Sequence, residues 1–148
     1  LGETVHVVAQ SLGLWHVHQR GDRDDYVTIN QQHVKEDEQA SFSTISDEYL
    51  DTQGLPYDYA SVMHFSGFDG KSPANAYTLQ TADRKNQKTI GQRTGLSFSD
   101  IRALNLGYCA NVCDGYNPDC ENGGYADPND CNKCKCKDGF AGDLCEDL

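Results

Sequence analysis

Residues 6–16 read HVVAQSLGLWH, and this stretch decides how the first part of the chain folds. Together with the residue before it, the stretch places four apolar side chains at i, i+3, i+4 and i+7: Val5, Val8, Ala9 and Leu12. This is the period of an amphipathic helix. A glycine just past the last periodic residue ends a helix, because glycine adopts the left-handed backbone conformation without steric cost. The sequence therefore predicts a helix over residues 2–12 that ends at Gly13, where the chain turns and carries His16 back toward the helix.

The same stretch has the spacing of the zinc signature H-E-x-x-H-x-x-G-x-x-H, in which three histidines coordinate one Zn²⁺ ion. His6 and His16 occupy the first and third histidine positions, with Gly13 between them, and are the candidate metal ligands. Gln10 stands at the middle ligand position, where an amide oxygen is a weaker donor than imidazole. The signature's glutamate, which takes a proton from the metal-bound water and passes it to the leaving amine, corresponds to Val7. Because valine moves no proton, this replacement alone predicts a rate lower by roughly 10²–10⁴-fold.

Three longer segments carry a family resemblance: GLWHVHQRGDRDDYVTIN (13–30), LPYDYASVMHF (55–65) and IGQRTGLSFSDIRALNLGYC (90–109). In order and approximate spacing they resemble the astacin family of metzincin zinc metalloendopeptidases, and the resemblance spans residues 2–109. It implies an α+β fold, namely the C-terminal subdomain of a metzincin catalytic domain, with a zinc helix, a Met-turn, a C-terminal helix and long loops. Zinc is the cofactor that the resemblance implies.

Residues 61–64 (SVMH) resemble the Met-turn, in which the methionine, here Met63, packs beneath the metal site without coordinating it. Family members follow this turn with a tyrosine that ligates zinc at rest and stabilises the developing oxyanion, whereas this chain has Phe65. The loss of one oxyanion donor lowers a rate roughly 10²–10³-fold. Val17 is a further departure, because the family has a glutamate there that pairs with the mature N-terminal amine. His18 is more simply a packed residue than a substitute zinc ligand.

All seven cysteines lie at or beyond residue 109, which predicts a domain boundary near residue 110, with a peptidase domain over 1–109 and a small module over 110–148. Six of them follow the spacing Cys-x6-Cys-x10-Cys-x2-Cys-x-Cys-x8-Cys, which resembles an EGF-like module. Spacing alone leaves about fifteen pairings open, and the resemblance implies Cys113–Cys131, Cys120–Cys134 and Cys136–Cys145. A zinc site built from Cys131, Cys134 and Cys136 is the competing interpretation. The residues before Cys113 lack the acidic cluster of calcium-binding EGF modules, so no calcium site is expected.

Cys109 is left over from this frame. The resemblance implies that its disulfide partner lies in the N-terminal half of the catalytic domain, together with a twisted sheet that forms the upper wall of the substrate cleft. That half is missing from the sequence, and because neither an initiator methionine nor a signal peptide stands at Leu1, we expect a chain truncated at its start. Disulfides persist in oxidising compartments, so we expect a secreted or extracellular protein.

Other segments carry local signals. Asn30 is a candidate cap for a short helix through Val34, residues 35–48 are polar and loop-like, and residues 69–93 predict long loops. Ser97 followed by Asp100 resembles a capping box. It predicts a second helix, which three apolar residues continue at helical spacing: Ile101, Leu104 and Tyr108.

The charge of the chain limits its partners. A net charge of −11 and a pI near 4.6 repel nucleic acid and anionic membrane surfaces, so neither is an expected partner. No apolar run in the sequence approaches the length that spans a bilayer. Arg20-Gly21-Asp22 matches an integrin-binding tripeptide, but a solvated turn is the simpler interpretation.

Three functions from different classes are compatible with these observations. An active zinc endopeptidase would need compensation for Val7, Gln10 and Phe65. A truncated relic without a stable fold is suggested by the missing half and by Cys109. The favoured hypothesis is a secreted pseudoprotease that binds a peptide or an extracellular-matrix protein, because the family framework is present beside replaced catalytic positions.

Overall fold

The computed structural model describes residues 1–71, 76–116 and 118–148, and it divides into two units, Leu1–Asp100 and Ile101–Leu148. The division falls inside helix α2 (Phe98–Tyr108), earlier in the chain than the boundary that the cysteines suggest. Among the described residues, no helix has both the length and the apolar character needed to cross a membrane.

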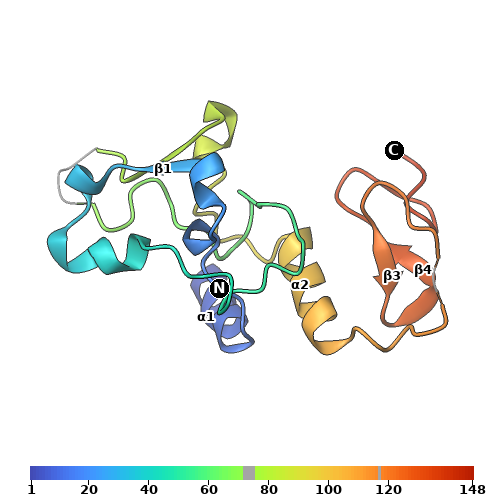
Figure 1. Cartoon of the computed structure of the whole chain (residues 1–148). Helices are drawn as coiled ribbons and strands as arrows, with labels where there is room; N and C mark the ends of the chain where they lie inside the picture. Colours follow the sequence, from blue (N-terminus) through green and yellow to red (C-terminus); the bar gives the residue numbers. More distant parts are fainter. Residues whose placement is uncertain (72–75, 117) are drawn as a thin grey trace. The chain divides into compact units, whose positions relative to one another are not determined.

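The first helix of unit one, α1 (Gly2–Ser11), confirms the prediction from residues 2–12 (Figure 1). It ends where Gly13 adopts a φ of +97°, a backbone conformation that side chains other than glycine's rarely allow. The N–H groups of Leu12 and Gly13 donate back to carbonyls in the last turn of the helix, which satisfies the end of its hydrogen-bond ladder.

The apolar stripe of α1 is only partly covered. Ala9 is buried against Val62 and Met63, whereas Val8 is 51% exposed and Leu12 is 43% exposed. The sequence pattern thus places the helix correctly but does not predict how much of its apolar face is buried.

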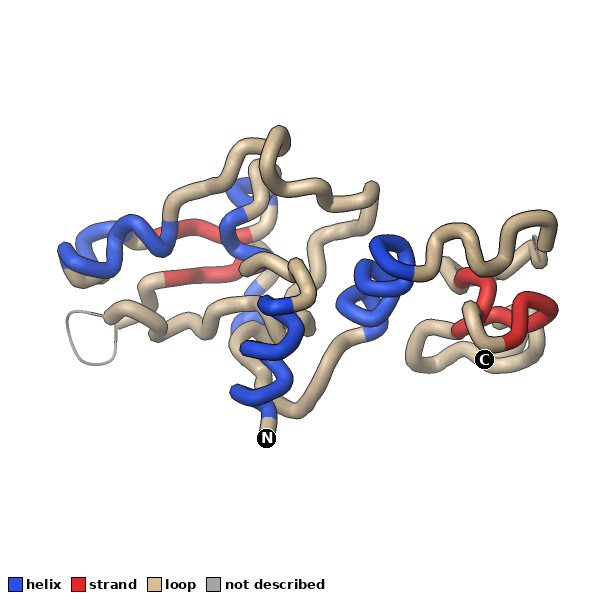
Figure 2. The backbone as a smooth tube through the Cα atoms, turned by 90° about the horizontal axis from the view of Figure 1, so that it is seen from below, coloured by secondary structure: helices blue, strands red, loops and turns tan. Residues whose placement is uncertain are grey.

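The same unit contains a two-stranded antiparallel sheet, whose strands run side by side in Figure 2. Strand β1 (Val27–Ile29) pairs with β2 (Leu79–Thr81), with Val27 opposite Thr81 and Ile29 opposite Leu79. The prediction that residues 69–93 form only loops is therefore wrong: they contain β2 and the 3₁₀ helix η5 (Arg84–Lys88). Residues 72–75 of that stretch lie outside the described residues. Three-residue strands are too short for their periodicity to stand out in a sequence.

Among the described residues between α1 and β2 there are four further 3₁₀ helices: η1 (Val17–Gln19), η2 (Arg23–Asp25), η3 (Gln31–His33) and η4 (Glu36–Phe42). The loop predicted over residues 35–48 is corrected by η4, which ends at the fully buried Phe42. This ring joins the core cluster of Val27, Val34 and Leu79, so one apolar residue anchors an otherwise polar segment.

Asn30 does not act as the predicted cap. The helix η3 does follow it, but the Asn30 side chain makes no capping hydrogen bond. Its Nδ2 donates instead to the carbonyl of Tyr77 and to Oε1 of Gln80, each at 3.0 Å. A long-range contact to β2 therefore takes the place of the local cap.

The capping box at the start of α2 is confirmed. The N–H of Asp100 donates to Oγ of Ser97, and the N–H of Ser97 donates to Oδ2 of Asp100, both at 3.0 Å. The buried Asp100 carboxylate also accepts from Oγ of Ser61 at 2.6 Å and from the N–H of Val62 at 2.9 Å. The cap thus also holds residues 61 and 62 in place.

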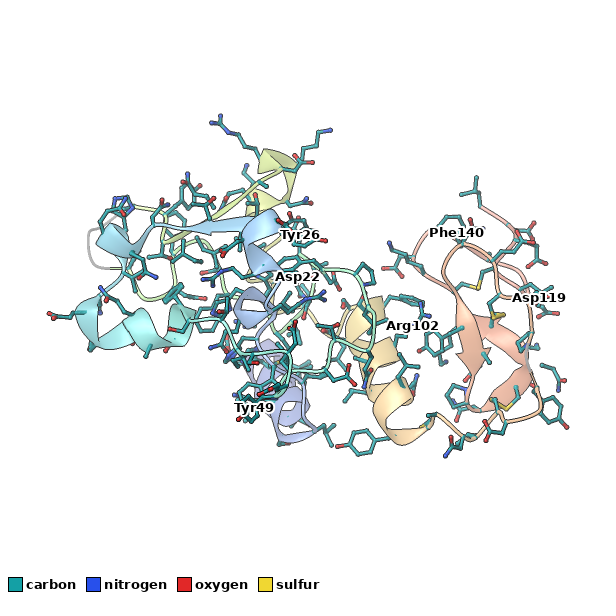
Figure 3. All side chains as sticks on the ribbon, viewed as in Figure 1. Asp22, Tyr26, Tyr49, Arg102, Asp119 and Phe140 are labelled. Atoms are coloured by element: carbon teal, nitrogen blue, oxygen red, sulfur yellow. A yellow bond between two sulfur atoms is a disulfide. The ribbon has the colours of Figure 1, made fainter. Side chains whose placement is uncertain are left out.

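The second unit contains a hairpin of β3 (Tyr125–Asp127) and β4 (Asp130–Lys135) and three disulfides. The pairs are Cys113–Cys131, Cys120–Cys134 and Cys136–Cys145, the same pairs that the resemblance implies, and they are drawn as yellow bonds in Figure 3. Cys109 carries no disulfide. Because each of Cys131, Cys134 and Cys136 is bonded to another cysteine, the competing zinc interpretation of the tail is excluded.

Replacing Asp100 by alanine tests this anchor. The change removes an acceptor from three donors, Ser61, Val62 and Ser97, and leaves buried donors unsatisfied, so we expect the free energy of unfolding to fall by about 3 kcal/mol. Urea denaturation of unit one measures the effect. The exposed carboxylate of Asp37 supplies the control, and Asp37→Ala should change the stability by less than about 0.5 kcal/mol; equal losses in both variants would contradict the anchoring role.

Candidate functional site

His6 lies on the buried face of α1 and is only 8% exposed. Its Nδ1 is 2.8 Å from the carbonyl oxygen of Val62. A carbonyl only accepts, so Nδ1 carries the proton and Nε2 carries the free lone pair. A backbone carbonyl of this kind is the usual partner that orients a metal-binding histidine.

His16 approaches His6 after the turn at Gly13. The two Nε2 atoms are 3.2 Å apart, and the rings stack with centroids 5.2 Å apart. Nδ1 of His16 lies 3.1 Å from Oε1 of Gln19, which fixes the same tautomer as in His6. Two nitrogen ligands of a tetrahedral zinc ion, each about 2.0–2.1 Å from the metal, lie roughly 3.3 Å apart. The pair therefore has the spacing of two zinc ligands.

Two Nε2 lone pairs that face each other at this distance repel unless a proton or a cation lies between them. Burial lowers the pKa of His16 below its ordinary value, while the Gln19 hydrogen bond opposes this shift and the nearby His6 adds to it. Protonation of His16 beside His6 is therefore disfavoured.

A third ligand is not supplied. Gln10 is exposed on α1, and among the described residues no three His, Cys, Asp or Glu side chains gather closely enough to hold a metal ion. A catalytic zinc needs three protein ligands beside its water. The residues present therefore do not fit the three-histidine site that the signature describes.

The two proton-handling positions are apolar. Val7 is 61% exposed on α1 and carries no titratable group. The Phe65 ring lies 4.8 Å from the His16 ring and 3.9 Å from the His18 ring, centroid to centroid. A hydrocarbon ring covers the histidines at the point where an oxyanion donor is expected, so the site has neither a general base nor this donor.

Comparison with known proteins assigns the chain that carries this site to a family. The family model of Astacin, a peptidase family, matches residues 1–109. The chain belongs to the astacin family.

Its relatives within the family are metalloproteinases. The chain is 44% identical over 153 residues to zinc metalloproteinase dpy-31 of Caenorhabditis elegans, covering 100% of this chain and 25% of that protein. It is 43% identical over 148 residues to dpy-31 of Haemonchus contortus, covering 100% of this chain and 27% of that protein. This astacin-family chain thus spans about a quarter of the length of the curated relatives it matches.

A solved structure shares the fold. High choriolytic enzyme 1, a hatching-enzyme zinc protease from the medaka Oryzias latipes, matches with a TM-score of 0.68 and 29% identity, covering 73% of this chain and 52% of that one. The mixed helix and strand arrangement of unit one is therefore an astacin-like fold.

Two residues that position the histidines in this astacin-family chain could not be recognised from the sequence. Nη1 of Arg93 donates to the carbonyls of Val62 and His64 at 3.0 and 3.1 Å, and so holds the segment that orients His6. Gln19 orients His16 in the same way. The only sequence signal for either residue is its place in a segment of the resemblance: Arg93 lies in residues 90–109 and Gln19 in residues 13–30. Met63, 1% exposed, packs beneath α1 against Ala9.

His18 does not replace the absent ligand. The side chain is fully buried, its Nε2 lies 2.9 Å from the carbonyl of Ser41, and its ring centroid is 5.7 Å from that of His16. Burial lowers the pKa of His18 to about 3. It is a packed neutral residue, as the sequence suggested.

The charged side chains of the Arg20-Gly21-Asp22 tripeptide bind each other. The Arg20 guanidinium donates to both carboxylate oxygens of Asp22, at 2.7 and 2.8 Å, and Nη1 also donates to the carbonyl of Leu55. Asp22 is labelled in Figure 3. A partner would have to break this bidentate pair, which supports the interpretation as a structural turn.

Buried histidines make the stability of unit one depend on pH. His64 is fully buried between the Tyr57 hydroxyl, which donates to its Nε2 at 2.7 Å, and the carbonyl of Phe65. Burial lowers its pKa from 6.5 to about 4. Between these values the unfolded chain binds a proton that the folded chain does not, so the free energy of unfolding falls as the pH falls, by up to about 1.4 kcal/mol per pH unit.

Between pH 4 and 6.5 we expect His64→Gln to reduce the slope of the free energy of unfolding against pH by the contribution of one proton, which is up to about 1.4 kcal/mol per pH unit. Urea denaturation at several pH values measures the slope, and His33→Gln, which changes a histidine near the surface, is the matched control and should keep the wild-type slope. A His64→Gln protein with an unchanged slope would show that His64 is not held neutral.

Proposed function

We propose that this protein is a secreted astacin-family pseudoprotease that binds an extended peptide or an extracellular-matrix protein and does not hydrolyse it. The observation that carries the proposal is the apolar or amide character of three positions that need reactive groups: Val7, Gln10 and Phe65. The scaffold around them retains the helix, the histidine pair and the anchored segment over residues 61–64. A folded site without a general base can bind a peptide but cannot activate water.

The second unit supports an extracellular role for the proposed protein. Six of its cysteines pair in the order first with third, second with fourth and fifth with sixth, around a single hairpin. We propose that it is an EGF-like module and that Cys109 pairs with a cysteine in a part of the protein before Leu1. Three disulfides in so small a unit are typical of proteins from oxidising compartments.

An active zinc endopeptidase is the second candidate, and one observation favours it. The Nε2 atoms of His6 and His16 lie 3.2 Å apart, with both Nδ1 atoms anchored, which is the arrangement of two preorganised zinc ligands. If zinc bound there, it would polarise a carbonyl and lower the pKa of a bound water. Gln10 or a group outside this chain would have to complete its coordination.

The first experiment measures zinc by elemental analysis of the purified, dialysed protein, together with hydrolysis of an unstructured protein and binding of a fluorescent peptide. We expect less than about 0.1 zinc per chain, no cleavage, and saturable peptide binding. About one zinc per chain, with cleavage that a chelator abolishes, would refute the pseudoprotease proposal and support the second candidate. Peptide binding separates the two inactive alternatives, because the proposed pseudoprotease binds the peptide whereas an unfolded relic would not.

A gain-of-function variant sharpens the test. Val7→Glu with Gln10→His and Phe65→Tyr restores all three groups, and we expect it to retain about one zinc per chain. The matched control places the same residue types elsewhere: Val8→Glu and Ser11→His lie one residue further along α1, and Phe68→Tyr lies three residues after Phe65. On α1 a shift of one residue turns a side chain by about 100°, so the control should bind no zinc. Zinc uptake by both variants would contradict the assignment of His6 and His16 as the two retained ligands of the site.

A further inference from the structure

A polar groove of about 740 Å³ lies on the outward face of the two-stranded sheet, away from the histidine pair. Thr28 of β1 and Gln80 of β2 are opposite each other in the strand register and are both exposed at its floor. Their neighbours Val27 and Leu79 point into the core, as the alternation of a strand requires. The volume is that of a site for a small molecule or a short polymer segment.

One wall of the groove is strongly cationic. It is formed by η5, which contributes three exposed cations: Arg84, Lys85 and Lys88. Lys85 and Lys88 are one 3₁₀ turn apart and therefore share a side of the helix. No ion pair formed by the described residues includes any of the three. Asp83 is the nearest carboxylate in sequence, and it caps the helix by accepting from the N–H of Lys85.

This concentration is unusual for the chain. The protein has 12 Lys and Arg residues against 23 Asp and Glu, yet three of the cations stand within five residues beside one groove. Unpaired cations in a concave site raise the local concentration of an anion. The groove is therefore suited to an anionic ligand, although the protein as a whole repels anions.

The cationic wall is held rigidly to the sheet. Oε1 of Gln87 accepts from the N–H of Thr81 at 2.9 Å, and its Nε2 donates to the carbonyl of Leu79 at 3.0 Å. Gln87 thus acts as an extra pairing partner for the β2 edge and fixes η5 beside it. Cations on a fixed element lose less conformational freedom on binding.

Tyr77 adds an aromatic side chain to the lining. It is 38% exposed and stacks on Phe68 with ring centroids 4.6 Å apart. Its carbonyl accepts from Asn30 and His33, so its backbone is anchored. An aromatic ring beside an exposed hydroxyl and an exposed amide offers both an apolar face and hydrogen-bonding groups, which is what a sugar ring, with its C–H faces and hydroxyl edges, requires.

We propose that this groove binds a sulfated glycan segment, with sulfate groups at Arg84, Lys85 and Lys88 and a sugar ring at Tyr77. Sulfate and uronate groups supply the anions, and the sugar hydroxyls match Thr28 and Gln80. The net charge of −11 disfavours a long polyphosphate, most of which would lie outside the groove, whereas a short sulfated oligosaccharide needs contacts only with the groove lining. The site acts independently of whether the histidine pair holds zinc.

Calorimetric titration with a size-defined sulfated oligosaccharide of the heparin type tests the proposal. We expect Lys85→Glu with Lys88→Glu to weaken binding at least about tenfold. The control Lys35→Glu with Lys137→Glu makes the same charge change at exposed lysines outside the groove and should alter the affinity less than about twofold. Equal weakening by both double variants would overturn the site, because it would show a diffuse charge effect.

Further arms identify the ligand chemistry. Tyr77→Ala should weaken binding of the oligosaccharide, while Tyr49→Ala, which removes a 78% exposed ring elsewhere, should not. The fully desulfated oligosaccharide should bind much more weakly than the sulfated one. No binding of the sulfated oligosaccharide, binding of inorganic sulfate with the same affinity, or equal binding of a nucleic acid of matched charge would each refute a glycan site.

Discussion

The buried Asp100 carboxylate accepts hydrogen bonds from Ser61, Val62 and Ser97, and the geometry of the histidine pair depends on this acceptor. It joins the start of α2 to the segment whose Val62 carbonyl orients His6. Arg93 holds the same carbonyl from another direction. Asp100 is far from the zinc signature in sequence, yet it positions His6 through Val62, whose N–H donates to Asp100 and whose carbonyl accepts from His6.

The parts of this arrangement that follow from local chemistry could be predicted from the sequence. Gly13 ends α1 because a glycine can take the positive φ that the turn needs, and Ser97 with Asp100 forms a reciprocal cap within one helical turn. The candidate ligands His6 and His16 were found for the same reason, since their spacing is set by one helix and one turn. All of these depend on residues close together along the chain.

What escaped prediction depends on contacts between distant segments. Strand β2 is only three residues long and exists because it pairs with β1, about fifty residues earlier in the chain. Asn30 had a local capping role available and instead binds β2. The roles of Arg93 and Gln19, and the exposure of Val8, likewise follow from the tertiary arrangement, which no pattern within a helix or a turn contains.

The distribution of cysteines gives the two units opposite sensitivities. Residues 1–100 contain no cysteine and are held by apolar packing around the buried, neutral His18 and His64, whereas the described residues of the second unit form one short hairpin and three disulfides. Mild acid acts on the first unit and leaves the links of the second intact, while a reductant does the reverse. A fall in pH and a rise in thiol concentration would therefore destabilise different units of the molecule.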